Sequence, residues 1–283
     1  MDFTDEGNGL LTVLPGYPAT NPPSGIFRKV EANYGSRGLS AWIGLPSTED
    51  SSVGEDQFSE TKDQGYIYTG GGAAGWEVDA GLQLGHTGNE GWKPYIIAKK
   101  GEDATFYGKP KRPMASGEYW ITTTWPILMG FRIPGLAGTP SGTVALSFES
   151  PSGEETIVHY YRDPTTHQPV REVIPDCLFV CTVPGWKSNT SVRIKRVNSI
   201  AQDKNYLANH PTYGTPGYAP IGSYVLNASW GDVWDLVTLL PGGEWTSGRT
   251  YRQGGFPGYP YVRYLTQVEY SWETMITLDT NGF

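Results

Sequence analysis

The chain has 283 residues, of which 38% are hydrophobic and 18% charged, and its formal net charge is −8 at neutral pH. The length allows one large β domain or two smaller ones, and the 37 glycine and 22 proline residues favour short strands joined by turns. The acidic balance argues against a nucleic-acid partner or an anionic membrane surface, and no apolar run reaches the roughly 20 residues of a membrane span.

The chain begins with a Pro/Gly-rich segment, residues 1–37, which we expect to be irregular. Strand-like segments then follow one another at 38–45, 64–71, 75–84, 92–99, 117–125, 127–133, 142–150, 154–162, 177–183, 190–202, 223–240 and 261–280. No helical period persists over three turns. We therefore predict that residues 1–283 form a single all-β domain, a two-sheet antiparallel β-sandwich. The polar gaps at 46–63 and 203–222 are expected to be loops over a binding face.

The segment GWEVDAGLQLG, residues 75–85, alternates with a period of two. Its apolar side chains fall on one face of the predicted strand, and the polar face carries Glu77, Asp79, Gly81 and Gln83. A slip of one residue would bury both charges, so we predict that Glu77 and Asp79 share the face that points away from the core. The two carboxylates are then catalytic acids, a ligand-binding pair or solvated side chains.

Aromatic side chains in the segment 117–125 are candidates for stacking on sugar rings. Alternation places Trp120 with Thr122 and Thr124 on the more polar face, and Tyr119 with Ile121 on the other. Trp120 is therefore the predicted exposed platform.

The two cysteines, Cys177 and Cys181, lie in the segment DCLFVCTV. In an extended strand their Cα atoms would be about 13 Å apart, whereas a disulfide needs about 4.4–6.8 Å. We predict two buried thiols, with a local disulfide across a tight turn as the alternative.

Five strings along the chain carry a resemblance: GYIYTGG, WEVDAGLQ, WKPYI, VRIKRVNSIAQ and GSYVLNASWGDV. In these strings the chain resembles the YrpD-like secreted proteins of bacilli, whose function is unknown. More broadly, the order of strands over about 38–280 resembles the concanavalin A-like jelly roll, a group that contains glucanases, alginate lyases and lectins. The resemblance implies a curved sandwich whose concave face could take a carbohydrate chain.

The resemblance also allows a test of catalysis. The jelly-roll glucanases use three acids at alternate positions, Glu-x-Asp-x-Glu, and this chain has Glu77 and Asp79 but Gly81 where the acid should stand. Glycine cannot donate a proton, so no catalytic residue is assigned, and we expect Gly81 to leave open space beside the carboxylates. His159, within IVHYY, is expected to be packed and hydrogen-bonded rather than a general base.

The sequence thus predicts a non-catalytic β-sandwich that binds a carbohydrate or cell-envelope surface through Glu77, Asp79, Gln83 and Trp120. The alternatives are a polysaccharide-active hydrolase or lyase and a structural or assembly protein whose edge strands pair between subunits. No metal or cofactor motif is present. The composition is typical of secreted bacterial β proteins; since MDFTDEGNG lacks the features of a signal peptide, we expect a mature secreted chain with an added start methionine.

Overall fold

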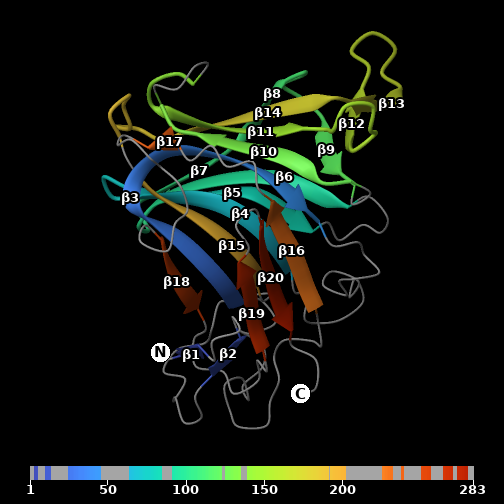
Figure 1. The fold of residues 1–283 in the computed structure, drawn as a ribbon. Helices are drawn as coiled ribbons and strands as arrows, with labels where there is room; N and C mark the ends of the chain where they lie inside the picture. Colours follow the sequence, from blue (N-terminus) through green and yellow to red (C-terminus); the bar gives the residue numbers. More distant parts are fainter. Residues whose placement is uncertain are drawn as a thin grey trace, which may run out of the picture.

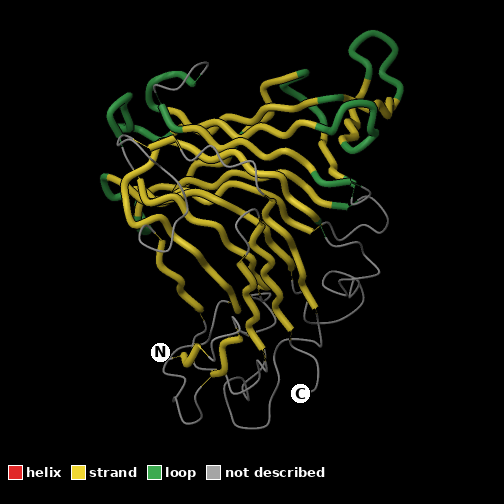
Figure 2. The backbone as a smooth tube through the Cα atoms, viewed as in Figure 1, coloured by secondary structure: helices red, strands yellow, loops and turns green. Residues whose placement is uncertain are grey.

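The computed structural model describes residues 3–5, 10–13, 25–45, 64–84, 91–122, 125–134, 139–190, 192–201, 225–231, 237–238, 250–255, 264–269 and 273–279. Strands and turns make up this part of the chain, and no helix occurs in it (Figure 2). Accordingly, none of its segments is a helix long and apolar enough to cross a membrane. Every strand pairing within it is antiparallel, which confirms the predicted fold class, an antiparallel β-sandwich.

Two layers of strands pack face to face (Figure 1). The first layer joins the second half of one long strand to four others, in the order β3 (Gly25–Gly44), β10 (Ile127–Arg132), β11 (Thr143–Glu149), β14 (Asp176–Thr182) and β8 (Lys109–Arg112). The second layer starts from the first half of β3 and continues through β15 (Val192–Ala201), β4 (Gln64–Ala73), β5 (Trp76–Leu84) and β6 (Trp92–Lys100). Because β3 bends and belongs to both layers, backbone pairing is continuous from one layer to the other.

The remaining strands extend the two layers. Beyond β6 the second layer continues to β7 (Ala104–Tyr107) and, through β9 (Glu118–Ile121), to β12 (Ile157–Arg162) and β13 (Pro169–Ile174). Three of these remaining strands also pair with β3: β16 (Val225–Gly231), β17 (Val237–Thr238) and β18 (Thr250–Gly255). A chain of pairings runs from β16 through β20 (Glu273–Asp279), β19 (Tyr264–Glu269) and β2 (Leu10–Val13) to β1 (Phe3–Asp5).

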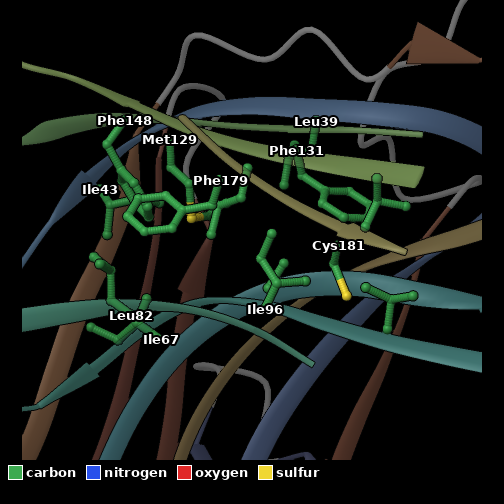
Figure 3. Packing of buried hydrophobic residues seen from close by; sticks show 14 of the residues in the cluster. Leu39, Ile43, Ile67, Leu82, Ile96, Met129, Phe131, Phe148, Phe179 and Cys181 are labelled. Carbon is green, nitrogen blue, oxygen red and sulfur yellow. The ribbon is translucent and has the colours of Figure 1, made fainter. Parts of the chain in front are cut away.

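The hydrophobic core lies between the two layers (Figure 3). Phe131 and Phe148 face it from the first layer, and Ile67, Leu82 and Ile96 face it from the second, all fully or almost fully buried. Burial of such side chains contributes about 1.5–3 kcal/mol each. The opposite faces of β4, β5, β6 and β15 look away from this core, and the predicted ligand residues of β5 belong to that side.

The strands predicted between residues 38 and 202 are all present, with most ends within three residues of their expected positions. The prediction of an irregular segment 1–37 was wrong in part, because β1, β2 and the first part of β3 lie within it. The gaps 46–63 and 203–222, expected to be loops, lie outside the described residues.

Candidate functional site

The two carboxylates of β5 point away from the core, as the alternation predicts. Trp76, Val78 and Ala80 are buried in the core, while the side chains of Glu77 and Asp79 between them are 54% and 34% exposed. Every second residue of a strand faces the same side, so the buried apolar set fixes the direction of both acids.

A lysine from β15 lies between the two acids. The ammonium Nζ of Lys195 is 2.6 Å from Oδ1 of Asp79 and also donates a hydrogen bond to Oε1 of Glu77. The side chain of Lys195 is only 8% exposed. One buried cation therefore holds two partly exposed anions, and the net charge of this carboxylate–lysine triad is −1.

The triad spans three strands, because β4 lies between β5 and β15. Two glycines make this possible: Gly70 pairs with Lys195 on one side and Asp79 on the other, and Gly72 pairs with Glu77. A Cβ at Gly72 would lie 2.5 Å from Oε2 of Glu77. The carboxylate thus occupies the space that a side chain on β4 would fill.

Burial alone would lower the pKa of the Lys195 ammonium, because a charged group loses its hydration there. The charges of Asp79 and Glu77 oppose this effect and outweigh it, so the pKa of Lys195 is raised above its ordinary value. Lys195 is consequently a permanent cation over the physiological pH range and cannot act as a base or nucleophile.

Tyrosines from β4 and β6 adjoin the triad on the same face. The ammonium of Lys195 lies 5.6 Å from the ring centroid of Tyr68, within cation–π range. Tyr95 contacts both Tyr66 and Tyr68 edge to face, with centroid separations of 5.6 and 6.3 Å. Burial raises the pKa of all three phenols, that of Tyr66 to about 12, so they remain neutral hydrogen-bonding groups.

The other two predicted ligand residues, Gln83 and Trp120, lie further along this face. Gln83 pairs with Tyr66 and Lys93 on its two neighbouring strands. Trp120 is 6% exposed, and the ammonium of Lys93 lies 5.3 Å from the centroid of its ring. The expectation that Trp120 is an exposed platform was therefore wrong, although its direction, opposite to the core residue Ile121, is as the alternation predicts.

The expectation of open space at Gly81 was also wrong. A Cβ built there would lie 2.2 Å from the backbone oxygen of Ile67 and 2.5 Å from Cα of Tyr68. The neighbouring strand fills this position, so the chain could not accommodate a third acid here without moving β4.

His159 and the cysteines have the packing that the sequence predicts. His159 is fully buried, its Nε2 lies 2.9 Å from the backbone oxygen of Ser116, and its ring stacks between Tyr119 and Tyr161. Both cysteines are free and buried. In the part of the chain that is described, no group of three or more His, Cys, Asp or Glu side chains could hold a metal ion.

Sequence reasoning missed Lys195 and the tyrosines. Lys195 lies 118 residues from Glu77, and only the strand order β5–β4–β15 brings them together. One signal was available: Val192 and Ile194 alternate into the core, which places Lys195 on the polar face, where two adjacent acids require a cation.

No family model and no curated protein sequence matches this chain. Among solved structures, the chain is similar to scytalido-glutamic peptidase, crystallised with a transition state analog inhibitor. The TM-score is 0.42 and the sequence identity 12%, and the match covers 90% of this chain and 98% of the peptidase. A similarity of this size gives no indication of the activity of this chain.

Proposed function

We propose that this protein is a secreted, non-catalytic β-sandwich that binds a carbohydrate, either free or on a cell-envelope surface. One observation carries the proposal: a buried lysine fixes two partly exposed carboxylates beside a cluster of tyrosines on the sheet face opposite the core. Carboxylate oxygens accept hydrogen bonds from sugar hydroxyls, and aromatic rings can stack on the C–H faces of sugars.

Preorganisation supports this reading. Lys195 holds both Glu77 and Asp79 before any ligand arrives, so a ligand does not have to order these side chains, and the entropic cost of binding falls. The finer assignment to a concanavalin A-like jelly roll, and secretion itself, rest on the sequence resemblance and on composition.

Two features argue against the hydrolase alternative at this site. A glycosidase needs two carboxyl groups with different roles, one that donates a proton and one that attacks or activates water, whereas here both carboxylates bind the same ammonium, so their surroundings do not assign them different roles. The Gly81 position has no room for a further acid. The buried ring of His159 is likewise out of reach of a polysaccharide.

The assembly alternative needs strand edges that can pair between chains. At the outer edge of the first layer, β8 has the sequence KPKR and carries an ion pair between Arg112 and Asp176. Proline and clustered cations at an edge oppose strand addition, so this edge does not favour assembly.

The experiment is a binding screen of the purified protein against soluble and insoluble polysaccharides and isolated cell walls, followed by calorimetry on whatever binds. Glu77→Gln and Asp79→Asn are expected to weaken binding by about tenfold or more, because each removes a charged acceptor. Asp176→Asn is the matched control, since Asp176 belongs to a partly exposed ion pair in the other layer.

Two outcomes would overturn the proposal. One is the absence of binding to every carbohydrate by the parent protein. The other is release of reducing ends by the parent that Glu77→Gln abolishes, which would show a hydrolase.

A further inference from the structure

The register of the second layer aligns the triad with an exposed aromatic residue at the edge of the sheet. Paired residues of adjacent strands share a face, and the pairings place Lys195, Gly70, Asp79, Ile97 and Tyr107 in one row across β15, β4, β5, β6 and β7. Tyr107 thus belongs to the same face as the two carboxylates, two strands away from Asp79.

The direction of Tyr107 is fixed by its neighbour in the strand. The ring of Phe106 packs against the core residue Trp76, with centroids 5.5 Å apart. Tyr107 must then point to the opposite side, and it is 67% exposed. Between Tyr107 and Asp79 in the row lies Ile97, a half-buried apolar side chain.

We infer that Tyr107 is a second contact for the carbohydrate, so that the ligand lies across the strands from the triad to β7. The inference rests on the proposed function and adds to it the direction and minimum length of the ligand. Adjacent strands are about 4.8 Å apart, so β5 and β7 are separated by roughly 10 Å. That distance exceeds a single sugar unit, which means that only an oligosaccharide could contact both ends.

The chemistry of the row also defines the ligand class. The accessible polar atoms of the triad are carboxylate oxygens, because the Lys195 ammonium lies beneath Glu77 and Asp79 and is almost fully buried. These oxygens accept hydrogen bonds and do not donate them. Ile97 and Tyr107 add an apolar floor and an aromatic ring. A chain rich in hydroxyl groups matches this order of contacts, and Lys99, the exposed cross-strand partner of Glu77, adds one cation to the same face.

The test is a calorimetric titration of the parent, Tyr107→Ala and Tyr107→Phe with glucose, mannose and the cello- and manno-oligosaccharides from dimer to hexamer. Tyr107→Ala should weaken hexamer binding about fivefold to tenfold and leave the binding of the monosaccharides unchanged, because only a longer chain reaches β7. Tyr107→Phe should retain the parent's affinity, since the ring is kept. Trp125→Ala is the control, because Trp125 is another exposed aromatic residue and precedes β10 of the first layer rather than belonging to the row.

The outcomes separate the two claims. If the parent binds the hexamer and Tyr107→Ala binds it equally well, or loses affinity for monosaccharide and hexamer alike, the inference is wrong and the proposed function stands. If the parent binds none of these oligosaccharides but does bind another polysaccharide in the screen, the ligand class inferred here is wrong. If it binds no carbohydrate at all, both claims fall.

Discussion

Removing the ammonium of Lys195 is expected to destabilise the protein. In a Lys195→Met variant the two carboxylates of the triad would face each other without a cation. At 2.6 Å and an effective dielectric constant of about 20–40, Coulomb's law gives about 3–6 kcal/mol for the contact between Lys195 and Asp79. Desolvation of the ammonium opposes this, and solvent screens Glu77 and Asp79, which are 54% and 34% exposed. We therefore expect a loss of about 1–3 kcal/mol in the free energy of unfolding.

The assay is urea unfolding followed by tryptophan fluorescence at about pH 7. Arg112→Met is the control, because it breaks a more exposed ion pair and should cost less than about 1 kcal/mol. Adding Glu77→Gln and Asp79→Asn to Lys195→Met should restore part of the lost stability, since no uncompensated charge remains. The reasoning is refuted if Lys195→Met costs no more than Arg112→Met, or if the triple variant is no more stable than Lys195→Met.

The free energy of unfolding should also depend on pH differently in the parent and in Lys195→Met. Because the pKa of Lys195 is raised in the folded state, the stability that its charge provides is complete below about pH 10 and is lost only as pH rises through the folded-state pKa. The parent should therefore show no contribution from Lys195 titration between about pH 4 and 8. Urea unfolding of the parent and of Lys195→Met should therefore show the destabilisation by the substitution shrinking as pH rises above about 10.

Three further predictions concern the packing around the site and in the core. Gly81→Ala should lower the free energy of unfolding by about 2–4 kcal/mol, because the new Cβ meets the backbone of β4. Gly72→Ala should lower it less, because the new Cβ meets the flexible end of the Glu77 side chain. Urea unfolding compares the two variants. Burial raises the pKa of both Cys177 and Cys181, the latter to about 11. Iodoacetamide at about pH 8 should therefore leave the thiols of the native protein unmodified and add two adducts to the unfolded, unreduced protein. An unfolded protein without adducts would show a disulfide. Because the pKa of Tyr66 is raised to about 12, stability should fall as pH rises from about 10 to 12, and alkaline unfolding curves should be less steep in Tyr66→Phe; an unchanged curve would contradict this.

The fold could be predicted from the sequence wherever one face of a strand is apolar. In β5 the core residues Trp76, Val78 and Ala80 fix both the strand and the direction of its acids. The sequence did not predict β7, β8 and β13, because these strands lack a clear apolar face. Their residues are mostly exposed, and β8, with the sequence KPKR, has neither apolar alternation nor β-branched residues. Such strands form because backbone groups of β6, β14 and β12 need partners.

The site could be predicted only within single strands. Alternation gives the side on which Glu77, Asp79, Gln83 and Trp120 lie, but it does not give the order of strands. The neighbours of a residue depend on that order, and so do its counter-ion, its exposure and the space around it. Lys195 was missed, Trp120 was expected to be exposed, and Gly81 was expected to be open, all because β4, β6 and β15 supply the surroundings.

The second carboxylate distinguishes the triad from a simple ion pair between two strands. One carboxylate is enough to neutralise Lys195 and to tie β5 to β15 across the glycines of β4, which weaken that strand because they lack side chains. The second leaves a net charge of −1 on two side chains that remain partly exposed. The two like charges repel each other, which offsets part of the attraction that each carboxylate has for the ammonium. A ligand that donates hydrogen bonds to both carboxylates would use this excess charge.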